Sequence, residues 1–410
     1  MKTILATAYA INPYKGSEDG MGWNFMLQIA RFQKVIAVTR ENNQNQIEKY
    51  QAQFPNELYK NIQFIYFDLP YWMRFWKKGS RGAMLYYLMW QYGIVSFIRR
   101  KELVFDIAHN VNFHNDWTPS FLHKLNKPLV WGPIGHHPAI PKQYLKLYPY
   151  VYLIKDQLTW LIKKCFWRFS TALKTTVTKS NYVFTMNSAV VEYLPELANK
   201  SAVMPSVATQ DYGFLEDKKE ESNTFTLISA GRFVPLKGFD LSIISFSKFL
   251  KNLTFLNLDT TNIELVLVGN GPEELFLKSL VKELKIEKNV QFVHWIERTE
   301  LMEKFKNASV FLFPSHEGAG MVVAEALSFA LPVICLENTG PGEFVNELCG
   351  MKIKHQKHES TTDALSIAIN KLYTEPKLRT QMGLEARKHF LTHFHWDRRG
   401  EALKEIYDSL

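Results

Sequence analysis

The feature that most constrains the fold is a succession of strand, glycine turn and helix between residues 310 and 332. Val310–Phe313 is a short β-branched and aromatic run that a proline closes, which is typical of a buried strand. Gly318 and Gly320 permit a turn in which the backbone can approach a ligand closely. From Met321 onward, apolar residues recur at helical spacing until Pro332 ends the pattern.

Two carboxylates frame this turn. Glu317 precedes the glycines, and Glu325 lies about one turn into the helix, where its side chain leans back towards the helix start. The free N–H groups and the dipole of that start favour a phosphate. An anion with a carboxylate on each side predicts a sugar nucleotide, whose hydroxyls donate to the two acids. The alternative is a solvated Glu317 and a Glu325 on the wet face of an ordinary helix.

The stretch EGAGMVVAEAL, with seven residues between Glu317 and Glu325, resembles the E-x7-E signature of retaining glycosyltransferases of family 4. This resemblance implies the GT-B fold, an α/β architecture of two Rossmann-like domains facing across a cleft, with a C-terminal helix that crosses back to the first domain. It also implies that Glu317 contacts the transferred sugar and Glu325 the ribose. The donor-binding residues implied in this stretch are Glu317, Gly318, Gly320, Met321, Val322 and Glu325.

Two cations bracket an earlier turn. Arg232 and Lys237 follow the predicted strand Thr226–Ala230 and can neutralise a diphosphate, whose negative charge grows as the glycosidic bond breaks. The block GRFVPLKG resembles the family's G-R and K-G block, which implies that both side chains bind the donor diphosphate and assist its departure. The alternative is a pair of solvated cations beside a turn.

A second glycine pair begins at Gly269, after another predicted strand. Pro272 inside this turn, and Glu274 where a third glycine would be required, argue against a dinucleotide-binding motif. The family resemblance instead implies that Gly269 lines the donor site. It also implies that the backbone near Ile296 contacts the base.

The first half of the chain begins with a predicted strand and a loop that contains Gly16, a usual phosphate position in doubly wound domains. The segments GSEDGMGW and WGPIG resemble a family subgroup used in surface polysaccharide assembly. The resemblance implies that Gly16 faces the donor diphosphate from the first domain. The alternative is that Gly16 only turns the chain.

Histidines and a glycine loop mark the expected acceptor side. His109 ends the predicted strand Phe105–His109 and is the best match to a family histidine near the reacting sugar, with His114 as the second choice. Gly135 and His136 follow the next predicted strand. His136 and His137 stand where the subgroup has glycines, so the sequence leaves open whether these rings contact sugar or fill space.

The formal charge is +9 and the sequence pI about 9.1. Aromatic and basic residues interleave in Tyr71–Lys101 and in Lys142–Lys179. This pattern suits an anionic membrane surface, nucleic acid, or an aromatic core with solvated cations. No RNA-binding sheet motif or helix-turn-helix is evident, so we expect no nucleic-acid partner.

A chain of 410 residues with 46% hydrophobic content can bury two cores. The polar segment 205–223 predicts a linker, so we expect an acceptor-binding domain over 1–205, completed by a helix near 390–410, and a nucleotide-sugar-binding domain over 206–389. Three scattered cysteines, no signal-peptide pattern and no long apolar run predict a cytoplasmic protein, at most peripheral on the inner face of the membrane.

Together these features predict an enzyme, a retaining hexosyltransferase-type glycosyltransferase. It would move a sugar from a nucleotide sugar to a saccharide or lipid-linked saccharide in polysaccharide, lipopolysaccharide or capsule assembly. No Asp-x-Asp motif stands in a suitable place, so we expect no metal and no cofactor. The alternatives are a sugar-nucleotide epimerase or phosphorylase on the same fold, or a non-catalytic scaffold subunit. The sequence leaves the donor base and sugar, the acceptor, the linkage and the oligomeric state open.

Overall fold

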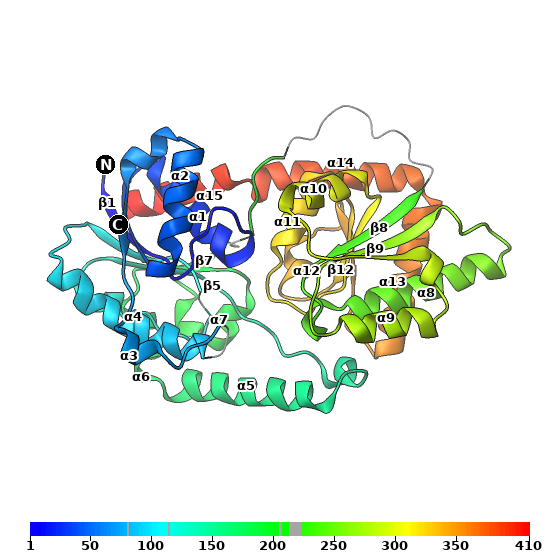
Figure 1. The fold of residues 1–410 in the computed structure, drawn as a ribbon, viewed down its shortest axis with the longest axis horizontal. Helices are drawn as coiled ribbons and strands as arrows, with labels where there is room; N and C mark the ends of the chain where they lie inside the picture. The colour runs from blue at the N-terminus through cyan, green and yellow to red at the C-terminus, as the bar shows by residue number, and fades with distance from the viewer. Residues whose placement is uncertain (80–81, 114, 205–206, 213–223) are drawn as a thin grey trace. The chain divides into compact units, whose positions relative to one another are not determined.

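The computed structural model describes residues 1–79, 82–113, 115–204, 207–212 and 224–410 (Figure 1). The chain divides into two compact units. Unit 1 contains Met1–His136, Thr159–Ser206 and Trp396–Leu410, and unit 2 contains His137–Leu158 and Val207–His395. The predicted linker falls largely outside the described residues.

Unit 1 is built on a parallel sheet of seven strands in the order β3-β2-β1-β4-β5-β6-β7. Its strands are β1 (Thr3–Thr7), β2 (Lys34–Thr39), β3 (Ile62–Tyr66), β4 (Ile107–Asn110), β5 (Leu129–Ile134), β6 (Tyr182–Thr185) and β7 (Ser201–Val203). Ile4 of β1 pairs with Val35 on one side and with Ile107 on the other. The strand order therefore reverses beside β1, and such reversal points in open α/β sheets are where ligands bind.

Helices connect these strands. They are α1 (Ser17–Ala30), α2 (Gln44–Gln53), α3 (Tyr71–Arg74), α4 (Ala83–Arg100), α6 (Thr171–Lys179) and α7 (Ala189–Tyr193), with α5 (Tyr150–Phe169) shared between the two units. On α4, Tyr86, Tyr87 and Trp90 are fully buried in the unit 1 core. The aromatic residues of this segment are therefore divided, because Tyr71, Trp72, Phe75 and Tyr92 are exposed.

The last helix of the chain, α15 (Trp396–Ser409), belongs to unit 1 and lies along α1, as the red and blue helices in Figure 1 show. The Trp396 ring meets Phe25 edge-on at 5.7 Å, and Lys2 donates to the carbonyl of Tyr407. This is the crossing C-terminal helix expected of the fold.

Unit 2 is built on a six-stranded parallel sheet in the order β10-β9-β8-β11-β12-β13. Its strands are β8 (Phe225–Ala230), β9 (Ile263–Val268), β10 (Val290–Val293), β11 (Val310–Phe313), β12 (Val333–Leu336) and β13 (Gly350–Ile353). Along β11, Val310 and Leu312 enter one hydrophobic cluster while Phe311 and Phe313 enter another. Both faces of the sheet are thus buried, which explains the uninterrupted apolar strands.

The helices of unit 2 cover these two faces. They are α8 (Phe239–Phe255), α9 (Glu274–Glu283), α10 (Arg298–Asn307), α11 (Met321–Ser328), α12 (Pro341–Phe344), α13 (His358–Thr374) and α14 (Pro376–His393). Among the described residues, no helix is both long and apolar enough to cross a bilayer.

The segment His137–Leu158 corrects the predicted domain boundaries, which placed it in the first domain. Tyr144 is part of the unit 2 core, and its hydroxyl lies 2.8 Å from Thr361 Oγ1 and donates to the carbonyl of Gln356. Burial of an aromatic ring together with its hydroxyl partners fixes this segment to unit 2.

Candidate functional site

The loop between β11 and α11, which carries Glu317, is fastened from two sides. The N–H of His316 donates to the carbonyl of Leu236 at 2.9 Å, and Asn338 Nδ2 donates to the carbonyl of Ser315 at 2.7 Å. A Cβ atom added to Gly340 would lie 2.0 Å from the carbonyl oxygen of Glu317, so these two backbones touch. The conformation of the loop is therefore fixed by contacts within unit 2.

Glu317 is paired with one of the two predicted cations. Lys237 Nζ donates to Glu317 Oε2 at 2.7 Å, and Ser315 Oγ lies 3.2 Å from the same oxygen. Both charged side chains keep 17% of their surface exposed, so a ligand can reach them. The ammonium also lies over the ring of Phe313. The structure thus brings together Glu317, which was predicted to contact the transferred sugar, and Lys237, which was predicted to bind the diphosphate.

Glu325 has a partner that the sequence analysis missed. Its buried carboxylate accepts from Arg298 Nη2 at 2.6 Å, and Arg298 also donates to the hydroxyl of Tyr212. Burial acts to lower the pKa of Arg298, but Glu325 and Tyr212 outweigh it and the pKa is raised. Arg298 therefore stays charged. The sequence did contain one signal for this residue. Arg298 is a cation in the first turn of a helix, two residues after Ile296, the predicted base-binding position.

Three loops meet at the carboxyl edge of the unit 2 sheet. Gly269, at φ 148°, follows β9, and a Cβ there would lie 1.9 Å from the carbonyl oxygen of Gly231, which follows β8. Gly238, at φ 66°, touches the carbonyl of Pro314 after β11 in the same way. Because only glycine permits these approaches, the loops of β8, β9 and β11 are held against one another. Arg232 is exposed on the first of them.

The remaining predicted donor positions lie on neighbouring elements of this edge. Ile296 follows β10 and packs against the hydrophobic cluster beneath α11. Gly320 caps the start of α11, where Met321 and Val322 are half-buried, and Gly318 is buried in the loop before it. The strand order brings the ends of β10, β9, β8 and β11 side by side, so these positions share one edge of unit 2.

The structure contradicts the prediction that His109 contacts the acceptor. His109 is fully buried, with Nδ1 2.5 Å from the hydroxyl of Tyr407 and Nε2 2.7 Å from the carbonyl of Gly132. Burial lowers its pKa to about 4. Both ring nitrogens are engaged inside unit 1, so His109 connects β4 to the C-terminal helix. His114, the second choice, lies outside the described residues.

His136 fills space within unit 1. Its Nδ1 lies 2.8 Å from the buried carboxylate of Asp116, and its ring stacks on Tyr193 at 4.1 Å and beside Trp167. Gly135 leaves room for Met186, whose methyl group would be 2.2 Å from an added Cβ. The ring is thus held by packing, which answers the question that the sequence left open for His136.

Gly16 caps α1, and the loop around it is joined to the loop after β4. Glu18 Oε2 accepts from the N–H of Phe113 at 3.1 Å, and Asn112 Nδ2 donates to the carbonyls of Glu18 and Ala10. Burial raises the pKa of Glu18, which the bond from Phe113 only partly offsets. The sequence analysis named Gly16 but did not single out Glu18, which follows it in the first turn of α1.

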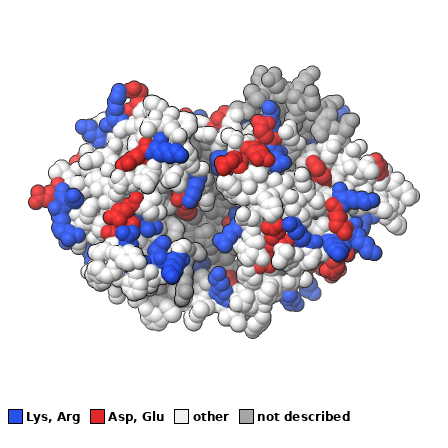
Figure 2. Space-filling model, viewed as in Figure 1, with Lys and Arg blue, Asp and Glu red and all other residues white. Residues whose placement is uncertain are grey.

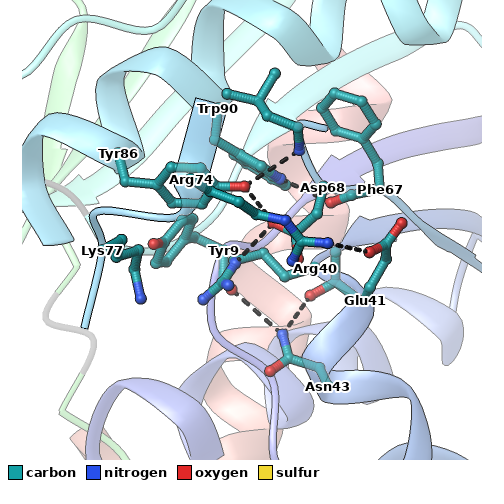
Figure 3. Close-up of polar contacts among 12 residues, drawn as sticks. Tyr9, Arg40, Glu41, Asn43, Phe67, Asp68, Arg74, Lys77, Tyr86 and Trp90 are labelled. Carbon is teal, nitrogen blue, oxygen red and sulfur yellow. Dashed lines mark hydrogen bonds and ion pairs between the residues drawn. The ribbon is translucent and has the colours of Figure 1, made fainter. Parts of the chain in front are cut away.

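A charged network that the sequence did not predict lies at the ends of β2 and β3 (Figure 3). The fully buried carboxylate of Asp68 pairs with Arg40 at 3.0 Å and Arg74 at 3.3 Å, and it accepts from the hydroxyl of Tyr86 at 2.6 Å. Arg74 also pairs with Glu41. No local pattern links these positions, because they are up to 46 residues apart in a chain whose strands bring them together.

Among the described residues, no group of three or more His, Cys, Asp or Glu side chains is arranged to hold a metal ion. The expected metal independence is not tested by this and stays a prediction.

Comparison with known proteins shows what the second half of the chain resembles. Residues 214–389 match the family model of glycosyl transferases group 1. We call this matched stretch the group 1 region. It contains Arg232, Lys237, Arg298 and both carboxylates, so the two ion pairs described above, Lys237–Glu317 and Arg298–Glu325, lie inside it.

Two curated relatives match about half of the chain. A GDP-mannose-dependent monoacylated alpha-(1-6)-phosphatidylinositol monomannoside mannosyltransferase of Corynebacterium glutamicum is 26% identical over 227 residues, 53% of this chain and 56% of that protein. An uncharacterized glycosyltransferase of Haemophilus influenzae is 30% identical over 44% of this chain and 49% of its own length. The chain therefore spans about half the length of these relatives.

Solved structures extend the likeness to both units. Anabaena Alr3699/HepE in complex with UDP superposes with a TM-score of 0.64 at 13% identity, covering 100% of both chains. Sucrose-phosphate synthase from Thermosynechococcus elongatus gives a TM-score of 0.66 at 16% identity, covering 100% of this chain and 99% of that one. These likenesses and the two parallel sheets confirm the predicted GT-B fold, to which the group 1 region contributes the second sheet.

Proposed function

We propose that this protein is a retaining glycosyltransferase that moves a sugar from a nucleotide sugar to a saccharide or lipid-linked saccharide. The observation that carries the proposal is the pair of carboxylates flanking the start of α11. Each is held by its own cation, Glu317 by Lys237 and Glu325 by Arg298, inside the group 1 region. Paired charges at the carboxyl edge of a parallel sheet suit a ligand with both phosphates and hydroxyls.

Each of these side chains has a proposed role in binding the donor. Arg232 and Lys237 neutralise the diphosphate, and the N–H groups of Gly320, Met321 and Val322 bind sugar and phosphate oxygens. When phosphate engages the ammonium of Lys237, Glu317 is released to accept a hydroxyl of the transferred sugar. Glu325, kept ionised beside Arg298, accepts from the ribose hydroxyls.

The proposed reaction proceeds at one face of the sugar. The bond between the anomeric carbon and the diphosphate oxygen breaks, and Lys237 and Arg232 stabilise the growing negative charge on the leaving phosphate. That phosphate accepts the proton of the attacking acceptor hydroxyl, whose oxygen forms the new bond on the same side. The anomeric configuration is retained, and no protein nucleophile or bound metal takes part in this scheme.

The names of the relatives support a lipid-linked or polysaccharide acceptor. One relative acts on a phosphatidylinositol mannoside, and another is a lipopolysaccharide core biosynthesis glycosyltransferase of Rhizobium meliloti, 26% identical over 47% of this chain. The first of these relatives is GDP-mannose-dependent, and UDP-glucose is bound in a structural neighbour, Anabaena Alr3699/HepE. We therefore propose a hexosyl donor and an acceptor used in surface glycan assembly, on the cytoplasmic face of the membrane.

The acceptor is proposed to bind at the carboxyl edge of the unit 1 sheet. His109 is replaced in this role by Glu18 of the Gly16 loop and by the network of Figure 3, in which Arg40, Arg74 and Lys77 outnumber Glu41 and Asp68. Burial and the neighbouring Arg40 lower the pKa of Lys77. Carboxylates and cations at a strand edge can bind the hydroxyls of a saccharide and an attached anionic group.

The decisive experiment is calorimetric titration with UDP, GDP and ADP and their glucose and mannose conjugates, followed by product analysis with the best donor. We expect one nucleotide to bind selectively, and Glu325→Gln to weaken it at least tenfold. Lys282→Ala, which changes an exposed cation on α9, is the matched control and should bind as the wild type does.

Four results would redirect the proposal. An isomerised nucleotide sugar formed without acceptor would indicate an epimerase, and release of a sugar phosphate would indicate a phosphorylase. A protein that binds none of these nucleotides would be a scaffold subunit with the same fold. An inverted anomeric centre in the product would remove retention from the proposal.

A further inference from the structure

Helix α5 presents apolar residues on two different faces. One face packs against unit 1, where the half-buried rings of Trp160 and Trp167 lie beside the ring of His136 and the buried Lys163 lies over the Trp160 ring. These three residues recur at intervals of three and four, as expected of one helical face. This face therefore accounts for the packing of the helix against unit 1.

A second face is exposed along the whole helix. We call it the α5 stripe, and it consists of Val151, Ile154, Leu158, Leu161, Ile162, Cys165 and Phe169. Its members also recur at intervals of three and four and occupy an arc of about 120°. Ile154, Leu158 and Leu161 remain 52%, 56% and 58% exposed, and Phe169 is 74% exposed. Contiguous apolar surface of this kind marks an interaction site rather than chance exposure.

The segment that contains this stripe is strongly basic. Residues 142–179 contain eight Lys or Arg and a single acidic residue, Asp156, a formal charge of +7 where the whole chain has +9. Helical spacing places Lys155 at one border of the stripe and Lys164 and Arg168 at the other. Along the lower edge of Figure 2, where α5 runs in Figure 1, white surface is accordingly interrupted by blue side chains.

We propose that α5 docks the protein on an anionic lipid bilayer, lying flat in the interface. The α5 stripe would enter the boundary between headgroups and acyl chains, while the bordering cations contact lipid phosphates. A helix with an exposed apolar face, cations beside it and too little hydropathy to span the bilayer has the properties of an interfacial anchor. The inference concerns where the protein docks and does not rest on the transfer reaction.

The positive charge of the α5 segment favours a bilayer over a second copy of the chain as the binding partner. Two α5 helices packed stripe to stripe would bring two segments of formal charge +7 together, and this repulsion opposes the apolar gain. An anionic bilayer supplies both the apolar phase and the opposite charge. In the other aromatic and basic segment, Tyr71–Lys101, the rings of Tyr86, Tyr87 and Trp90 are fully buried, while four further aromatic side chains are exposed and form no continuous stripe along α4.

The test is sedimentation of the full-length protein with vesicles, in the absence of donor. Vesicles of phosphatidylcholine alone are compared with vesicles that contain about one third phosphatidylglycerol, at low and at high salt. We expect binding only to the anionic vesicles, weakened by salt. The variant Ile154→Ser/Leu158→Ser/Leu161→Ser and the variant Lys155→Gln/Lys164→Gln/Arg168→Gln should each bind at least tenfold more weakly.

Phe255→Ser/Leu256→Ser is the matched control, because it removes two exposed apolar side chains at the end of α8 in unit 2, outside α5. It should bind as the wild type does, and thermal unfolding should show all three variants folded. The proposal fails if the wild type ignores anionic vesicles, if the stripe variant binds as well as the wild type, or if the control loses as much. It also fails if the wild type is a dimer that the stripe variant dissociates.

Discussion

Lys237 Nζ and Glu317 Oε2 lie 2.7 Å apart, although 80 positions separate the two residues in the chain. The contact joins the turn after β8 to the loop after β11. Without a ligand, each charge neutralises the other, so neither is left uncompensated at the edge of the sheet. A diphosphate that takes the ammonium would free the carboxylate, which makes phosphate binding and sugar binding interdependent.

We predict that Lys237→Met weakens nucleotide-sugar binding by about 10- to 100-fold, because a charge-assisted hydrogen bond contributes about 1.5–3 kcal/mol. Stability should change by less than about 1 kcal/mol, since the pair is partly solvated. Calorimetric titration and urea unfolding measure the two quantities. Equal donor affinity in Lys237→Met and in the Lys282→Ala control would show that Lys237 does not contact the donor.

Arg298→Met should lower the free energy of unfolding by about 2 kcal/mol, because it leaves the buried Glu325 carboxylate without its cation. The double variant Arg298→Met/Glu325→Gln should be more stable than the single variant, since it removes the unpaired charge as well. Urea denaturation of the four proteins of this cycle measures the coupling. Additive losses would mean that the two side chains act independently.

Asp68→Asn should cost about 3 kcal/mol of unfolding free energy, because Asp68 is fully buried and pairs with both Arg40 and Arg74. Glu41→Gln provides the comparison within the same network. Its side chain is half exposed, so its loss should cost less than about 1 kcal/mol. Similar losses for the two variants would contradict the central position of Asp68.

Acidification should destabilise the fold below about pH 6.5. Burial, with His355 and His358 nearby, lowers the pKa of His316 to about 3, and burial lowers that of His109 to about 4. The unfolded chain therefore binds more protons than the folded protein between those values and about 6.5, the ordinary histidine pKa. Stability falls with decreasing pH in this window, by up to about 1.4 kcal/mol per pH unit for each ring.

Urea denaturation between pH 7.5 and 4.5 measures this slope. His109→Gln should lower stability at pH 7.5 but reduce the slope, because the titrating ring is gone. His294→Gln, which replaces an exposed ring, should leave both unchanged. An unaltered slope in His109→Gln would show that this ring is not held neutral in the folded protein.

The sequence predicted the fold through its strands. Val310–Phe313 is uninterruptedly apolar because both faces of its sheet are buried, and the glycines beside it mark where backbones touch. The carboxylates of the site were equally visible, since their spacing is local. Arg298 was not, because its contact with Glu325 depends on how α10 packs beside α11.

The sequence also could not predict which of the candidate residues are buried. His109 stands at the end of a strand, as a ligand-binding residue would, but Tyr407 arrives from 298 residues away and covers it. Tyr144 in turn follows a strand of the first sheet and is buried in the second unit. Neither outcome has a local signature, because each depends on segments that approach only in the folded chain.

The placement of Tyr144 and of α15 bears on how this chain can be divided. The polypeptide passes between the two units four times, at 136–137, 158–159, 206–207 and 395–396. A fragment starting at Val207 would keep both carboxylates but would lack the Tyr144 ring in its core. A fragment ending at Ser206 would lack α15, and its His109 would be exposed because Tyr407 no longer covers it. Neither half is autonomous, so a functional chimaera with a related chain would have to exchange 137–158 together with 207–395.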